Sequence, residues 1–373
     1  MDDIKRTAIV IAALAVLLLI SSSFVGSNIM NRAIIIGVGV DKLEDGVRLT
    51  AEIVSPGNGS EQVGTYSKIV SANGRSVGQA IQKIAELTGK EASLGRCLLI
   101  ILGQDFYENT DFADTIDYFI NSDSFKESSA ICCCEGSAEE LMNKGPAVAQ
   151  SVSLALTTLL QDQAKKVAIV TNTLLDYTLS QKNMLKTGFL NKVKFLPSQN
   201  TDSNKPDQEQ GFFTINDLTV FRDNNFDCDL TPDESIGLAL FNDKVLGDTF
   251  SSDASGKLLT VNVNSKKIDK KIKDGEVTIT IKLFVKLART DSADVEGVFV
   301  SQDKKEIPKE TINDITEQAR QLSQAVIDRQ ISQNFDLIKI HDLYRQKQGS
   351  NKELENKPME EFNVNLKVEV IEK

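Results

Sequence analysis

The chain has 373 residues, of which 41% are hydrophobic and 25% are charged, as in ordinary globular proteins. This composition excludes a wholly disordered chain and a protein that crosses a membrane many times. The formal net charge of −11 repels nucleic-acid phosphate, so nucleic acid is not an expected partner. The length exceeds what one core usually serves and predicts two or three domains.

The first predicted element is a hydrophobic segment within residues 1–27. Lys5 and Arg6 precede an uncharged run from Thr7 to Ile20, which has the length of the apolar part of a signal peptide. Extension of this run to Val25 gives a helix long enough to cross a bilayer. A cleaved signal and a retained anchor both remain open. Because cations flanking such a segment stay inside, we expect the rest of the chain to face outward.

The next region, 28–196, alternates predicted strands and helices and is interpreted as an α+β region. An apolar run over 34–41, the dipeptide Asp45-Gly46 and alternating apolar residues over 47–53 predict a β-hairpin. The run contains Gly37 and Gly39 but not the third glycine of a nucleotide-binding loop, and a hairpin follows where a helix should hold phosphate. A nucleotide-binding loop at these glycines is therefore disfavoured.

Further along this region, helical spacing over 77–87, followed by Gly89, predicts a helix with a left-handed C-cap. Buried strands are predicted over 97–102 and 129–134, with an amphipathic helix starting near Asp111 between them.

A polar stretch over 197–211 has the composition of a linker, and a second α+β region is predicted over 212–373, with a possible split near 250. Its predicted strands are 213–221, 236–241, 259–263, 277–287 and 362–370. Pro308 opens a long helix with a one-sided apolar stripe, which we expect to pack on its own sheet. The fold class is thus a multi-domain α+β protein, with mixed or antiparallel sheets packed by helices and one N-terminal hydrophobic helix in front.

The five cysteines show neither metal-ligand spacing nor a disulfide framework. Cys97 and the triplet Cys132-Cys133-Cys134 sit in apolar runs and are predicted to be buried strand positions. We therefore predict no metal site, no cofactor and at least one free thiol.

Catalytic chemistry has few candidates. His341 is the only histidine and is predicted to make a polar contact at a helix end. Asp41, Glu44 and Asp45 could gather calcium, but turn chemistry explains them better. A lysine cluster could touch anionic lipid headgroups, although a solvated hairpin edge is the preferred interpretation. Its members are Lys266, Lys267, Lys270, Lys271 and Lys273.

Several segments together resemble the Ger(x)C family, the C subunits of nutrient germinant receptors in spore-forming bacteria. They are 34–45, 72–77, 95–100, 114–123, 236–247 and 336–345, in the family's order. The positions that mark the resemblance are Gly37, Gly39, Asp41, Gly74, Arg75, Gly95, Gly237, Phe241 and Gly247.

The resemblance implies a non-catalytic receptor subunit acting in spore germination, on the outer face of the spore inner membrane, with polytopic A and B type subunits as partners. Such proteins normally carry a cysteine that receives diacylglycerol, and Ser27 stands in that place. Since serine has no thiol, we expect an N-terminal helix to be the tether. The alternative is a membrane-anchored extracytoplasmic solute-binding protein, which requires a deep cleft between domains. A cell-wall hydrolase would require a carboxylate pair or a metal site.

Overall fold

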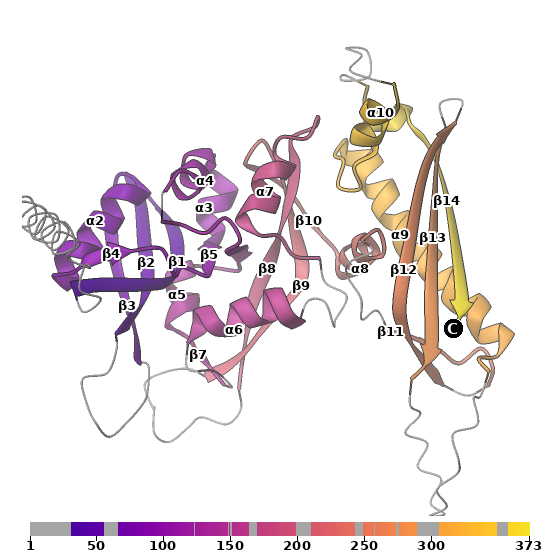
Figure 1. The fold of residues 1–373 in the computed structure, drawn as a ribbon, viewed down its shortest axis with the longest axis horizontal. Coiled ribbons are helices and arrows are strands. Elements are labelled where there is room, and N and C mark those ends of the chain that lie inside the picture. Colours follow the sequence, from indigo (N-terminus) through magenta and orange to yellow (C-terminus); the bar gives the residue numbers. More distant parts are fainter. Residues whose placement is uncertain are drawn as a thin grey trace, which may run out of the picture.

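The chain forms two β-sheets that lie at opposite ends of the described structure (Figure 1). The computed structural model describes residues 31–55, 66–122, 124–147, 149, 151–163, 170–198, 210–242, 249–256, 258–273, 276–288, 306–348 and 357–373. The predicted N-terminal hydrophobic helix lies outside these residues. Of the helices within them, none combines the length and the apolar character needed to span a membrane.

The first sheet has ten strands, with a path β10-β9-β8-β6-β5-β1-β2-β3, while β4 pairs with β1 and β7 with β9. The neighbours β1, β5, β6 and β8 run parallel, and the outer strands are antiparallel. The bounds are β1 Arg32–Leu43, β2 Gly46–Ser55, β3 Tyr66–Gly74, β4 Glu91–Ser93, β5 Leu99–Leu102, β6 Ala130–Cys134, β7 Gly145–Pro146, β8 Thr187–Pro197, β9 Gln210–Arg222 and β10 Asn225–Leu230.

The predicted first hairpin is confirmed. Strands β1 and β2 pair antiparallel from Ile34 opposite Val54 to Leu43 opposite Gly46. Gly46 has a φ of 119°, a conformation that a residue with a Cβ atom rarely adopts. The turn chemistry of Asp45-Gly46 therefore sets the register that places Asp41 opposite Arg48.

Helices cover both faces of the first sheet. They are α2 Val77–Thr88, α3 Gln104–Asn109, α4 Ala113–Ile120, α5 Ala138–Asn143, α6 Val152–Thr158, the π-helix η2 Leu159–Gln163 and α7 Leu174–Ser180. The core on one face includes residues of α2, α3, α4 and α7, and the core on the other includes residues of α5 and α6. The predicted α2 is confirmed with both caps, because the Ser76 side chain accepts from the Gln79 amide and Gly89 is left-handed.

The predicted burial of the cysteine runs is also confirmed. Strand β6 is buried at every position, so the triplet has no solvent-facing side. Cys133 belongs to the core under α3 and α4, whereas Cys132 and Cys134 belong to the core under α5 and α6. A strand covered on both faces explains why the run reads as continuously apolar rather than alternating.

The second sheet has the order β11-β12-β13-β14, where β14 is parallel to β13 and the other pairs are antiparallel. Its strands are β11 Thr249–Ser252, β12 Leu259–Lys273, β13 Glu276–Leu287 and β14 Asn363–Glu372. Helix α9 (Lys309–Gln333) lies across one face and buries Ile315, Ala319 and Val326 there, as its apolar stripe predicts. The short helices α10 (Ile340–Gln348) and η3 (Met359–Glu361) lead to β14.

The predicted strand at 236–241 is wrong, because this segment lies in helix α8 (Pro232–Leu240). The helix starts with a capping box, in which Thr231 and Glu234 exchange side-chain and backbone hydrogen bonds, and Pro232 occupies its first turn. A short continuous apolar run does not by itself distinguish a strand from a buried helix, so the cap decides.

Helix α8 joins the two halves of the structure. Its Leu238 shares a core with Leu218 of β9 and with the inner face of the second sheet. A Cβ on Gly237 would clash with the backbone carbonyl oxygen of Leu322, so α8 and α9 approach closely at this glycine. The boundary predicted at 197–211 stays a prediction; β9 and β10 pair within the first sheet, and the second sheet begins at β11.

Candidate functional site

The family-motif residues of β1 hold helices α5 and α6 against the sheet. A Cβ on Gly37 would overlap the Ser153 hydroxyl of α6, and one on Gly39 would lie 2.9 Å from both the Ala138 Cβ and the Met142 sulfur of α5. The glycines therefore permit close helix packing. They belong to a strand, which agrees with the rejection of a nucleotide-binding loop.

Asp41 follows on the same strand and caps α5. Its carboxylate accepts hydrogen bonds from the backbone amides of Ala138, at 2.7 Å, and of Glu139, at 2.8 Å. Burial raises the pKa of Asp41, although these hydrogen bonds oppose the rise. The turn role predicted for Asp41 is thus replaced by a contact between residues that are far apart in sequence.

Glycine is also required at position 103, at the end of β5, because a Cβ there would overlap the Asp41 Oδ1 atom. The next residue, Gln104, donates its amide to the Gly136 carbonyl at 2.8 Å, and its side-chain oxygen accepts from the Gly136 amide at 3.0 Å. The carboxyl ends of β1, β5 and β6 are therefore joined by one polar network.

An open depression of about 480 Å³ lies at this edge, with Asp41, Lys42, Gln104, Asp105 and Ser137 among its lining residues. Open α/β sheets usually bind ligands outside the carboxyl ends of their parallel strands. In this chain the first amides of α5 already bind the Asp41 carboxylate, so these hydrogen bonds have a structural role.

Arg48 lines both this depression and a second one, of about 670 Å³, beside β3 and α2. Its guanidinium donates to Glu139 at 2.6 Å and to the Asn73 side chain at 3.1 Å. Burial opposes ionisation of Glu139, but hydrogen bonds from Ser71 and Arg48 hold its pKa below the ordinary value. Arg48 is not among the residues predicted from the sequence, where its only signal is its position opposite Asp41 in the predicted hairpin.

The remaining motif residues do not join this network. Gly74 ends β3 against the backbone of Ala80, and the Arg75 amide donates to the Gln79 side chain at 2.7 Å. Gly95 lies beside Ser124, and Phe241 is buried in the core of the second half. Gly247 lies outside the described residues.

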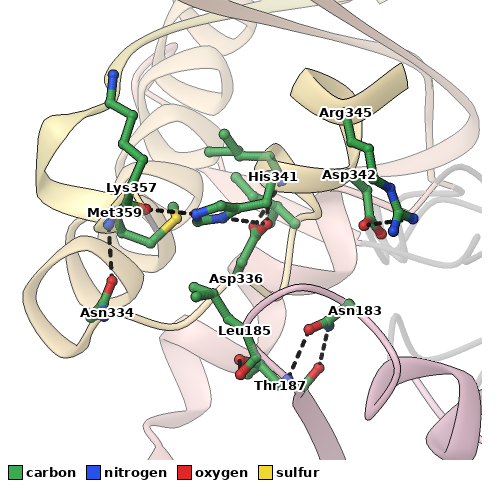
Figure 2. Close-up of polar contacts among 12 residues, drawn as sticks. Asn183, Leu185, Thr187, Asn334, Asp336, His341, Asp342, Arg345, Lys357 and Met359 are labelled. Carbon is green, nitrogen blue, oxygen red and sulfur yellow. Dashed lines mark hydrogen bonds and ion pairs between the residues drawn. The ribbon is translucent and has the colours of Figure 1, made fainter. Parts of the chain in front are cut away.

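A second polar cluster lies where α10 begins (Figure 2). Asp336 accepts hydrogen bonds from the amides of Ile340 and His341, both at 2.8 Å. The His341 ring reaches Asp336 through Nδ1, at 3.2 Å, and the Lys357 carbonyl through Nε2, at 2.8 Å. The predicted helix-end contact of His341 is confirmed, and it links α10 to the segment that enters β14.

The predicted solvated lysine edge is wrong for two of its members. Lys266 is buried and donates to the Ala239 carbonyl of α8 at 3.0 Å. Lys270 donates to the Ile338 carbonyl at 2.6 Å. Both point toward the helical side of the sheet, because alternate residues of a strand face opposite sides. Lys267, Lys271 and Lys273 remain exposed on the other side.

Both polar clusters are occupied by contacts within the protein. Within the ranges that the structure describes, no three His, Cys, Asp or Glu side chains are grouped to hold a metal ion. The polar groups of the Asp41 network and of the His341 cluster are engaged by backbone and side-chain groups of the protein itself. Both arrangements join distant segments, which is a structural role.

Two family models match the chain in succession. The model described as the spore germination protein N-terminal domain matches residues 26–193, and that described as spore germination B3/GerAC like, C-terminal, matches residues 216–372. Spore germination protein A3 of Bacillus subtilis (strain 168) is 23% identical over 276 residues, which are 71% of this chain and 69% of that protein. The crystal structure of the GerBC protein aligns with a TM-score of 0.53 and 14% identity, over 90% of this chain and 96% of that one, and shows a shared fold.

Proposed function

Because the chain belongs to the Ger(x)C family of spore germination proteins, whose two domain models span most of it, we propose that it is a non-catalytic C subunit of a membrane germinant receptor. The succession of the two family matches, in the order of the two halves of the fold, is the observation that carries this proposal. The family is not known for enzymatic activity. The motif residues of β1 and α8 also support a scaffold, since they make packing and capping contacts.

The proposed location is the outer face of the spore inner membrane, with the N-terminal helix from Thr7 to Val25 as the tether. The cations Lys5 and Arg6 favour this orientation. Ser27 cannot form the thioether that would attach a lipid, and a spanning helix retains a protein at least as firmly as acyl chains do.

The proposed partners are polytopic A and B type receptor subunits. This part of the proposal rests on family membership. A solute-binding protein would instead present an enclosed cleft between its two domains. The two depressions described above are open and lie on the first sheet, so they lend that alternative no support.

Purification of the protein from dormant-spore inner membrane in mild detergent, followed by mass spectrometry, tests the proposal. We expect polytopic A and B type subunits to co-purify and the peptide containing Thr7–Val25 to be intact. A chain that starts at Asn28 should be released from the membrane fraction by a high-salt wash more readily than the full chain. Recovery of the protein without such subunits, or its absence from spores, would contradict the proposal.

A further inference from the structure

The face of the second sheet that points away from α9 is lined with lysines. Side chains alternate along β12, β13 and β14, and the cross-strand register assigns each to one face. Val277, Ile279 and Ile281 point into the core with α9. The opposite set contains Lys267, Lys271, Lys273, Lys282, Lys286 and Lys367, and Lys373 reaches it at the end of β14. We call this surface the lysine face.

The charge of the lysine face is opposite to that of the chain. Among the described residues, this face carries seven lysines and three carboxylates, which are Asp269, Glu276 and Glu369. The whole chain carries a formal net charge of −11. Two of the carboxylates form ion pairs, Lys271 with Asp269 at 2.5 Å and Lys282 with Glu369 at 2.6 Å. A net positive surface remains.

The positive charge also opposes folding of the sheet. Lys267 lies directly opposite Lys282 in the antiparallel pair, and like charges at such positions destabilise a sheet. A solvated face would be served equally well by threonine or glutamine at either position. The arrangement is therefore better explained by a surface that binds anions than by stability.

An apolar pair lies among the lysines. Phe284 is opposite Ile371 in the parallel register, and Ile371 is 36% exposed. The Lys373 ammonium lies 5.7 Å from the centre of the Phe284 ring. Aromatic and aliphatic side chains ringed by lysines are typical of protein surfaces that rest on a lipid headgroup layer.

We propose that the lysine face lies against the anionic headgroups of the membrane that holds the chain. This inference rests on the membrane tether of the proposed function. All the cations that the described residues place on this face are lysines. Cores of protein interfaces are depleted in lysine and enriched in arginine, so an acidic partner protein is the weaker candidate. Each lysine close to an anionic lipid surface adds to the binding.

The contact would fix the orientation of the second half on the membrane. One N-terminal helix holds a protein at a membrane but does not determine which side faces it. A second attachment at β12–β14 would supply that orientation, because these strands form the sheet farthest along the chain from the N-terminus (Figure 1).

Lysine footprinting of the full chain tests the proposal. The protein is reconstituted in phosphatidylcholine vesicles or in vesicles with one third phosphatidylglycerol, and acetylation of each lysine is followed by mass spectrometry. We expect acetylation of Lys271, Lys273 and Lys367 to slow about threefold or more only with the anionic lipid, and the protection to vanish in about 0.5 M NaCl. Exposed Lys83 should react equally in both vesicles.

Charge-reversal variants separate this contact from general attraction. The triple variant K267E/K271E/K367E should lose the lipid-dependent protection of Lys273 and Lys286. The control K83E/K126E/K309E, with the same change in net charge at exposed positions elsewhere, should keep it.

Equal acetylation in the two vesicles would overturn the proposal. Protection that depends on protein concentration but not on lipid would also overturn it, because it would assign the face to a protein contact. Flotation of the chain with vesicles of phosphatidylcholine alone, which have no anionic headgroups, reports the tether separately, so loss of the tether and loss of the lysine contact are distinguishable.

Discussion

His341 and Asp336 form a buried pair in which both ring nitrogens of the histidine face acceptors, the Asp336 carboxylate and the Lys357 carbonyl (Figure 2). Only the doubly protonated imidazole can donate to both. Burial lowers the pKa of His341, but the hydrogen bonds to Asp336 and to the Lys357 carbonyl together raise it above its ordinary value. The nearby Asp342 carboxylate acts in the same direction.

Stability should therefore fall as the solution becomes alkaline. Because the pKa of His341 is higher in the folded than in the unfolded chain, its contribution is complete below the unfolded pKa and is lost as pH rises through the folded pKa. Urea unfolding followed by circular dichroism across this window measures the effect. The variant H341Q should be less stable by about 3 kcal/mol at the acidic end and should show a flatter pH profile.

The variant D336N is the matched test of the charge. It retains an acceptor oxygen but removes the negative charge, so the loss of stability should begin at lower pH than in the native protein. An unchanged pH profile in both variants would show that the pair does not control stability.

The contact between Asp41 and position 103 should appear as energetic coupling. The variant G103A places a methyl group where the Asp41 carboxylate lies and should destabilise the fold by about 2 kcal/mol or more. In a D41A background the same substitution should cost less, because the displaced group is gone. Urea unfolding of the four chains in this cycle gives the coupling energy, and strictly additive losses would contradict the contact.

Local signals in the sequence are sufficient to predict an element when the residues at its ends form a turn or a cap. Gly46 set the first hairpin and Gly89 the end of α2, because each acts on residues beside it. The same kind of signal was present at Thr231 and Glu234, yet the apolar run after them led to a strand prediction. The cap, and not the propensity of the residues within the run, determines that this segment is a helix.

Contacts between distant segments could not be predicted in this way. Asp41 meets the start of α5 only because β1 lies in one sheet with β5 and β6, and no pattern near Asp41 encodes that topology. Lys266 is buried for a similar reason, since a bulge in β12 before it and the position of α8 determine which way it points. Sheet topology is thus the information that the sequence patterns lacked.

Two motif glycines should differ sharply in their tolerance of alanine. At Gly237 a Cβ would meet the Leu322 backbone, which cannot move without separating α8 from α9, so G237A should destabilise by about 3 kcal/mol. At Gly95 the nearest atom is the Ser124 carbonyl oxygen at 3.4 Å, so G95A should cost less than about 1 kcal/mol. Thermal unfolding of both variants makes the comparison. Equal losses would show that α8 packing is not the reason for glycine at 237.

The cysteines should divide into one accessible and four protected thiols. Burial raises the pKa of Cys97 and of Cys133 to about 12, and it raises those of Cys132 and Cys134 well above the ordinary value. Cys228, on β10, is only partly buried, although burial raises its pKa as well. Thiolate is the reactive form, so a disulfide reagent at mildly alkaline pH should modify Cys228 first and the others only when the fold opens.

The variant C228S should lose the early phase in a spectrophotometric thiol assay, and full unfolding should expose the remaining four thiols together. Early modification of Cys132 or Cys134 in the folded chain would show that the core around β6 opens without global unfolding.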